Sequence, residues 1–268
     1  MSSKAPAISS QSLAGSHLAT VYDEPLCARG LGEFEGKYYL NNADALAQSL
    51  SRGVRALEVD VRLSADGKAC CSYGWGPEAR KLLGIEWDPT QGPMTEATFL
   101  KQKVGGRPTM SFERLYRHMK ENPELWWVLD FGKTGKENAT HLANAVVEGL
   151  HKDKALLSRC LVQVRNASMY RGVDRAYHFS HYQIMLWPRE RIDGLGRLIT
   201  YCADYNIEGL AIEASQCSEE VVAMVRKAGL KLQCFATDDA ELANTLLARG
   251  VNSICSFSLS PEDLNEVQ

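Results

Sequence analysis

Two acidic residues two positions apart, Glu58 and Asp60, lie in a run that is otherwise largely aliphatic. Alternate residues of a β-strand share a face, so both carboxylates point to the same side of such a strand. The opposite side carries Leu57, Val59 and Val61. Similar apolar runs recur along the chain, which favours a strand in a buried sheet over a half-exposed surface strand. Carboxylates that face an enclosed space need a compensating cation, and a hard divalent metal ion is the usual one.

Eight strand-like runs, with helical patterns between most of them, predict the structure that positions these carboxylates. The alternation favours a parallel sheet, and eight repeats favour closure into a (β/α)8 barrel, the TIM-barrel architecture of the α/β class. An open doubly wound sheet is the alternative, although no Gly-x-Gly-x-x-Gly opens the first unit, which disfavours its dinucleotide-binding version. The runs span residues 26–29, 55–63, 126–130, 160–165, 183–187, 209–213, 231–236 and 253–256.

Local signals agree with this order of elements. Asn42 is suited to cap the helix that follows it, and the pair Asp66 and Gly67 predicts a tight hairpin. Asp238 and Glu241 have the spacing of a capping box for the last helix. We therefore expect the chain to alternate between strands and helices up to its end.

The predicted domain organisation is simple. We expect residues 1–22 to form a flexible, Ser/Ala-rich N-terminal arm. Residues 23–268 are predicted to form a single barrel domain, and its Gly- and Pro-rich stretch at about 74–110 is a long excursion from the barrel.

The composition disfavours several classes of partner. A net charge of −3 over 268 residues gives no electrostatic reason to expect binding to nucleic acid or to an anionic membrane. No apolar run is long enough to predict a transmembrane segment, and the N-terminus lacks an apolar signal core. Most of the eight cysteines lie in aliphatic runs, which is typical of small buried residues in a reducing compartment. The expected location is therefore the cytoplasm, and the absence of a Cys-x2-Cys pair disfavours zinc.

The chemistry of a barrel lies at the C-terminal ends of its strands. Glu58, Asp60 and Asp130 end two strands that adjoin in the predicted barrel, and three carboxylates suit one divalent cation, Mg²⁺ or Ca²⁺. Arg29 and Arg165 would add positive charge beside them, and a metal ion with arginines is what a phosphate ester or phosphodiester requires. A salt-bridged polar barrel mouth is the alternative interpretation. The other residues at strand ends are Tyr73, Gln163, Trp187, Glu213, Thr237 and Ser256.

Short motifs in the first half of the chain resemble those of a known superfamily. Residues 28–32 read Ala-Arg-Gly-Leu-Gly and residues 39–42 read Tyr-Leu-Asn-Asn. Glu-Val-Asp at 58–60 is followed by Ser-Ala-Asp-Gly-Lys at 64–68, and Tyr-Gly-Trp stands at 73–75. These stretches resemble Ala-His-Ala-x-Gly, Tyr-Thr-Asn-Ser, Glu-x-Asp and His-Asp-Trp of the glycerophosphodiester phosphodiesterase and phosphatidylinositol-specific phospholipase C-like superfamily, in a bacterial-type branch.

The second half of the chain extends the resemblance in the same order. Val-Leu-Asp-Phe-Gly-Lys at 128–133 resembles the third strand, which ends in an acidic residue and then Lys. Similar matches occur at 162–170, 236–239 and 250–254, so the resemblance covers about residues 26 to 264. It implies a PLC-like (β/α)8 fold, a divalent cation on the three carboxylates, hydrolysis of a glycerophosphodiester or related phosphodiester, and a place in lipid metabolism.

The chain departs from this superfamily at the residues that transfer protons. Arg29 and Tyr73 stand at the positions of its two catalytic histidines. Arginine does not release its proton in proteins and tyrosine titrates near pH 10, so neither transfers protons well at neutral pH. Each such role contributes roughly 10²- to 10⁴-fold in rate, so losing both costs on the order of 10⁴-fold or more. Lys133 is one residue beyond the usual Asp-x-Lys spacing, which would turn it to the outer face of a strand.

No histidine in the predicted barrel is placed to substitute for them, and only the flexible arm, which contains His17, could bring one near the site. His178 and His181 precede a strand, at the opposite end of the predicted barrel. The remaining histidines lie in helical patterns or in the arm: His118, His141, His151 and His17. Trp75 and Trp187 lie nearer the mouth and are candidates for the floor of a ligand pocket.

Two functional hypotheses remain nearly balanced, with a slight preference for the first. One is a divergent metal-dependent phosphodiesterase with Arg29, Arg165, Trp187 and Lys133 as candidate substrate-binding residues. The other is a catalytically silent pseudoenzyme that binds a phosphorylated ligand or partner. A barrel retained only for assembly, without a metal ion, is the third possibility.

Overall fold

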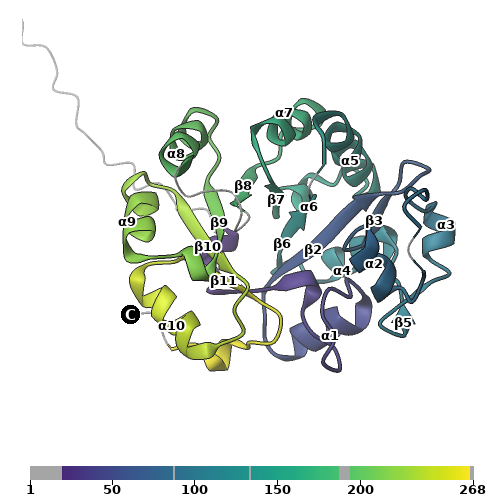
Figure 1. The fold of residues 1–268 in the computed structure, drawn as a ribbon, viewed down its shortest axis with the longest axis horizontal. Coiled ribbons are helices and arrows are strands. Elements are labelled where there is room, and N and C mark those ends of the chain that lie inside the picture. The colour runs from purple at the N-terminus through teal and green to yellow at the C-terminus, as the bar shows by residue number, and fades with distance from the viewer. Residues whose placement is uncertain (1–19, 87, 133, 187–193, 266–268) are drawn as a thin grey trace, which may run out of the picture.

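The computed structural model describes residues 20–86, 88–132, 134–186 and 194–265 of the chain. Eight parallel strands follow one another around a ring, and the first pairs with both the second and the last, which closes the barrel (Figure 1). The (β/α)8 prediction is therefore confirmed, and the open-sheet alternative is wrong. The barrel strands are β1 (Leu26–Ala28), β2 (Ala56–Leu63), β6 (Trp126–Asp130), β7 (Cys160–Val164), β8 (His181–Leu186), β9 (Gly209–Glu213), β10 (Lys231–Phe235) and β11 (Ser253–Ser256).

Helices surround the strands (Figure 1). None of them, within the described part of the chain, is long and apolar enough to cross a membrane. They are α1 (Ala43–Ser51), α2 (Pro77–Leu82), α3 (Glu96–Phe99), α4 (Phe112–Glu121), α5 (Lys136–Gly149), α6 (Lys154–Leu157), α7 (Ala167–Ala176), α8 (Leu195–Asp204), α9 (Glu219–Lys227) and α10 (Ala240–Arg249).

The hairpin and the excursion add elements to one side of the barrel. Strand β3 (Ala69–Cys71) runs antiparallel to β2 after a turn at Asp66 and Gly67, as predicted. Helices α2 and α3 follow, and then the antiparallel pair β4 (Lys103–Val104) and β5 (Arg107–Pro108). These short elements lie together on one side of the barrel (Figure 1).

The alternation along β2 separates two cores. Leu57, Val59 and Val61 belong to the large hydrophobic cluster that also contains buried residues of the helices. Ala56 belongs instead to the smaller cluster inside the barrel, together with Val128 of β6. Residues two and four positions after Ala56 share its face, so Glu58 and Asp60 face the barrel interior.

The barrel interior is layered from an apolar floor to a charged mouth. A short 3-10 helix, η1 (Val21–Asp23), places Tyr22 in the floor, where its hydroxyl donates to Gln183 Oε1 at 2.8 Å. Gln183 Nε2 donates to Gln163 Oε1 at 2.7 Å and to Gln233 Oε1 at 3.1 Å. Gln163 is thus part of an amide layer below the mouth. Residues 1–19 of the predicted arm lie outside the described residues.

The helix-cap predictions have mixed outcomes. Asn42 caps α1 as predicted, because its side chain accepts from Ala45 N. The predicted capping box at Asp238 is wrong: the cap of α10 is the next residue, Asp239. Asp238 instead accepts from Ser256 Oγ at 2.5 Å and from two backbone amides that follow β11. Asp238 therefore binds a segment distant in the sequence and does not cap the neighbouring helix.

Candidate functional site

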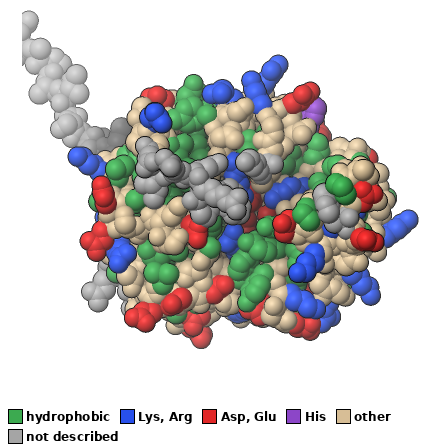
Figure 2. All heavy atoms as spheres, in the orientation of Figure 1, with side chains coloured by type: hydrophobic (Ala, Val, Ile, Leu, Met, Phe, Trp, Pro, Cys, Tyr) green, Lys and Arg blue, Asp and Glu red, His purple; other side chains and the backbone are tan. Residues whose placement is uncertain are grey.

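A cavity of about 580 Å³ opens at the C-terminal ends of β1, β2, β6 and β7. On this face of the molecule, basic and acidic side chains meet near the centre, where the surface is hollowed (Figure 2). The lining includes Arg29, Glu58, Asp60, Asp130 and Arg165 from these strand ends, and Tyr73, which follows β3.

Three buried carboxylates converge at the bottom of this cavity. One oxygen from each of Glu58, Asp60 and Asp130 lies within 4.8 Å of the others. The register of the sheet explains this, because Asp60 of β2 is paired with Asp130 of β6 and both face inward. The predicted three-carboxylate cluster is therefore present in the structure.

Backbone and amide donors fix each carboxylate. Glu58 Oε2 accepts from Gly30 N at 2.5 Å, and Asp130 Oδ1 accepts from Gly132 N at 2.7 Å. Asp60 and Asn41 form a reciprocal pair: Asn41 Nδ2 donates to Asp60 Oδ2 at 2.9 Å, and Asp60 N donates to Asn41 Oδ1 at 2.8 Å. Asn41 belongs to the Tyr-Leu-Asn-Asn stretch, and this motif was the only sequence signal for its role.

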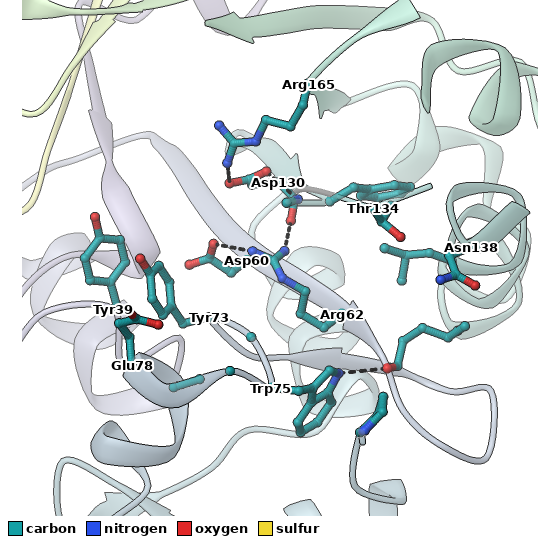
Figure 3. A pocket seen from close by; sticks show the side chains of 18 of the residues that line it. Tyr39, Asp60, Arg62, Tyr73, Trp75, Glu78, Asp130, Thr134, Asn138 and Arg165 are labelled. Carbon is teal, nitrogen blue, oxygen red and sulfur yellow. Dashed lines mark hydrogen bonds and ion pairs between the residues drawn. The ribbon is translucent and has the colours of Figure 1, made fainter. Parts of the chain in front are cut away.

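Two arginines pair with the aspartates (Figure 3). Arg165 Nη2 lies 2.8 Å from Asp130 Oδ2. Arg62 Nη2 lies 3.2 Å from Asp60 Oδ1, and Arg62 Nη1 donates to the Asp130 carbonyl at 2.7 Å. Arg62 was not among the predicted site residues, although its position two residues after Asp60 puts it on the same face of β2 and was a usable signal.

Arg62 can lie across β6 only because residue 132 is a glycine. Gly132 has φ +61°, and a Cβ there would fall 2.4 Å from Arg62 Cζ. The left-handed conformation also lets the Gly132 amide donate to Asp130. One glycine thus fixes both an acid and an arginine of the site.

Arg29 is held by aromatic rings. Its guanidinium carbon lies 5.2 Å from the ring centroids of Tyr39 and Phe257 and 5.1 Å from that of Phe235. Cys27 of β1 and Cys255 of β11 face the barrel interior. Arg29 and Phe257 each lie two residues farther along the chain, so they share that face and lie nearer the mouth. Phe257 therefore packs against a cation at the mouth of the barrel.

Burial and neighbouring charges act differently on the three acids. Burial raises the pKa of Glu58 well above its usual value, and the charge of Asp60 raises it further. Burial also raises the pKa of Asp60, although Arg62 partly opposes this. For Asp130, burial is outweighed by Arg165 and Arg62, which lower its pKa. The positive charges near Glu58 and Asp60 therefore do not fully offset the cost of burying these two carboxylates.

The donor set fits a hard divalent cation. Within the described residues, Glu58 Oε1 accepts no hydrogen bond, and oxygen-only ligands suit Mg²⁺ or Ca²⁺. A cation would supply the compensation that Glu58 and Asp60 lack. Glu58, Asp60 and Asp130 are the residues that would hold it.

The aromatic residues at the mouth do not supply an acid or base for neutral pH. The Tyr73 and Tyr39 rings lie 4.3 Å apart. Burial raises the pKa of both hydroxyls, with the Asp60 charge adding to the effect on Tyr73. Both phenols therefore keep their protons at neutral pH. Trp75 lines the cavity and donates from Nε1 to the Leu63 carbonyl at 2.9 Å.

Histidines are absent from the described lining of the cavity. His181 begins β8 at the opposite end of the barrel, with Nδ1 3.0 Å from Glu208 Oε2. His178 pairs with Asp174 at 2.6 Å, beyond the end of α7. The prediction that these histidines lie away from the mouth is confirmed.

Other predicted residues fall outside the cavity or outside the described chain. Trp187 and Lys133 lie outside the described residues. Thr237 Oγ1 accepts from Asp239 N at 3.1 Å, next to the cap of α10. Three further strand-end residues also do not line the cavity, namely Gln163, Glu213 and Ser256.

Comparison with known proteins decides the fold family. No protein-family model matches the sequence, and no curated protein matches it. Solved structures do match. An Oleispira antarctica phosphodiesterase, in complex with the product sn-glycerol-3-phosphate, has a TM-score of 0.71 at 16% identity, covering 89% of this chain and 95% of that one. This chain has the fold of the glycerophosphodiester phosphodiesterases.

Two further structures support the same fold. A glycerophosphodiester phosphodiesterase from Parabacteroides distasonis has a TM-score of 0.65 at 17% identity, with 90% of this chain and 95% of that chain covered. A Silicibacter pomeroyi protein named for the same activity has a TM-score of 0.69 at 15% identity, with 90% and 91% covered. At these identities, the likeness establishes the fold, a phosphodiesterase-like barrel.

Proposed function

We propose that this phosphodiesterase-like barrel binds the phosphate group of a small phosphate ester beside a divalent cation, with little or no turnover. The observation that carries the proposal is the buried cluster of Glu58, Asp60 and Asp130 next to Arg29. Enclosed carboxylates of this kind select a hard cation, and a guanidinium beside it selects a phosphate oxygen.

Each residue has a definite part in this proposal. Glu58, Asp60 and Asp130 hold the cation, which when bound neutralises phosphoryl oxygens and polarises the phosphorus centre. Arg165 fixes Asp130 through their ion pair. Arg29, which lies among aromatic rings in the lining of the same cavity, donates to the phosphate.

The absence of a proton carrier among the described residues of the cavity favours binding over hydrolysis. The described cavity lining contains no histidine, and Arg29 and Tyr73 keep their protons at neutral pH. A fixed arginine strengthens binding of the ground state as much as of the transition state, and uniform binding does not raise kcat.

Hydrolysis is the second candidate function, and the complete carboxylate set favours it. Under this proposal the chain is a divergent metal-dependent phosphodiesterase that acts on a glycerophosphodiester. Arg29 would stabilise the negative charge on the oxygens of the pentacoordinate phosphoryl group, and Tyr73 would serve as a weak acid. The solved enzymes of the same fold, one with sn-glycerol-3-phosphate bound, are consistent with a glycerophosphate group as ligand.

Thermal melting and turnover assays on the full chain separate these possibilities. We expect Mg²⁺ or Ca²⁺ to raise the melting temperature, glycerol 3-phosphate to raise it further, and glycerophosphodiester hydrolysis to be absent or slow. Hydrolysis that disappears in the Glu58→Ala/Asp60→Ala variant would support the second candidate. No shift with either ion would contradict both and leave a structural barrel.

A further inference from the structure

Arg29 is a buried cation whose hydrogen-bond donors have no acceptor within the described residues. Its side chain lies in the cavity, and the residue is only 8% exposed. The described chain supplies no hydrogen bond or ion pair to it. The guanidinium lies against the faces of Tyr39, Phe235 and Phe257. The charges of Glu58 and Asp60 act on it from a greater distance. A guanidinium carries five N–H donors, and those of Arg29 are directed to the cavity and not to a protein acceptor within the described residues.

The three rings fix the position of this cation without satisfying its donors. An aromatic face attracts a cation through its quadrupole and leaves the N–H groups free for an anion. The other arginines of the site differ in this respect, because Arg165 and Arg62 both have carboxylate partners. The feature that distinguishes Arg29 is therefore a fixed charge that is available to a ligand.

The charges of the site indicate how much negative charge that ligand carries. Among the described residues that line the cavity, the three carboxylates of the cluster are matched in number by three guanidinium groups, those of Arg29, Arg62 and Arg165. A bound divalent cation therefore leaves about two positive charges enclosed. Tyr39 and Tyr73 are neutral, and Glu78 on α2 is exposed, so solvent screens its charge.

We propose that Arg29 makes this site selective for a phosphate monoester dianion over a phosphodiester. A monoester carries close to two negative charges at pH 7, which cancel the surplus, and its third terminal oxygen gives Arg29 an acceptor. A diester carries one charge and offers one terminal oxygen fewer. This inference rests on the proposed function and names the ligand class of the same site.

Selectivity for a monoester also explains why an arginine stands at position 29. Arg29 stands where the resembled motif has a histidine, so a group that can be neutral has been replaced by a permanent charge. A site that holds a monoester tightly retains the product of diester hydrolysis. Such a site suits a receptor for monoesters better than a turnover enzyme.

Calorimetry with two matched esters tests the proposal. Glycerol 3-phosphate and its O-methyl phosphodiester differ by one methyl group and one charge. With the full chain, saturating Mg²⁺ and pH 7.5, we expect the monoester to bind at least about tenfold more tightly, because one more charge faces a partly buried guanidinium. Equal binding of the two esters, or tighter binding of the diester, would overturn the proposal.

Variants assign the selectivity to Arg29. We expect Arg29→Gln to bring the ratio of the two affinities close to one, whereas Arg29→Lys keeps most of it. Arg114→Gln, an exposed arginine on the outer helix α4, is the matched control and should leave the ratio unchanged. An Arg29→Gln protein that still prefers the monoester would refute the role of this residue. If that variant does not fold, the ratio of the two affinities in the wild-type protein decides whether the site is selective.

The outcomes distinguish this inference from the proposed function. If neither ester binds and Mg²⁺ does not change the melting temperature, the proposed function fails, and the inference fails with it. If both esters bind equally in a Mg²⁺-dependent manner, the proposed function stands and only the selectivity is wrong.

Discussion

Glu58→Gln should make the protein unable to bind a divalent cation without making the cation-free protein less stable. Glutamine keeps an acceptor for the Gly30 amide, which now bonds Glu58 Oε2 at 2.5 Å, and removes the charge. Because burial raises the pKa of Glu58, the wild-type protein loses stability as pH rises from the unfolded value through the raised folded one. The variant does not, so its relative stability should grow with pH.

With the cation bound, we expect the wild-type protein to be more stable than the Glu58→Gln variant. At a cation concentration 100 times Kd, mass action stabilises the wild-type protein by about 2.7 kcal/mol. For a chain of this size that free energy raises the melting temperature by roughly 5–10 °C. Without Glu58, one of three charged ligands is missing, and we expect the shift to fall below about 2 °C.

Scanning calorimetry measures the melting temperature of both proteins in four conditions, at pH 5 and at pH 8, each with Mg²⁺ or with EDTA. The wild-type shift with Mg²⁺ should be larger at pH 8, because the cation displaces the proton that the raised pKa retains at lower pH. Glu220→Gln, on the exposed face of α9, is the control and should behave like wild type. A variant that keeps the full Mg²⁺ shift, or that is less stable than wild type at pH 8 with EDTA, would refute the reasoning.

Three further predictions follow from individual contacts. Gly132→Ala should destabilise the protein by about 2–4 kcal/mol, because an alanine at φ +61° is strained and its Cβ displaces the Arg62 guanidinium; urea unfolding measures this. The double substitution Arg29→His/Tyr73→His should raise glycerophosphodiester hydrolysis at least about 10²-fold if missing proton carriers limit turnover, and an unchanged rate would contradict that explanation. Asp239→Ala removes the cap of α10 and should cost about 1 kcal/mol, measured as a fall in the urea midpoint.

Local patterns predicted the fold well. The alternation around Glu58 and Asp60 identified the face of β2 that turns inward, because strand geometry links sequence spacing to direction. The hairpin at Asp66 and the cap at Asn42 were also predicted correctly, since neighbouring residues make these contacts. The eight runs then predicted the barrel through their number and order.

Long-range contacts limited the rest. Asp238 looks like a helix cap from its neighbours, but Ser256 and the amides after β11 bind it instead. Arg62 lies on the predicted face of β2, yet its position depends on a carbonyl of β6 and on the glycine that follows it. Neither arrangement can be read from local spacing, because the register between strands decides it.

By itself the sequence determined which side chains of a strand face the barrel interior, because alternate residues of a strand share a face. It also determined that Arg29 and Tyr73, and not histidines, stand at the positions of the proton-transferring residues, because residue identity does not depend on folding. Only the tertiary structure decided that Glu58, Asp60 and Asp130 meet within 4.8 Å. It also decided that Arg29 lies among three rings from separate segments. The physical reason is closure of the barrel: β1 pairs with β2 on one side and β11 on the other, which brings distant strand ends around one cavity.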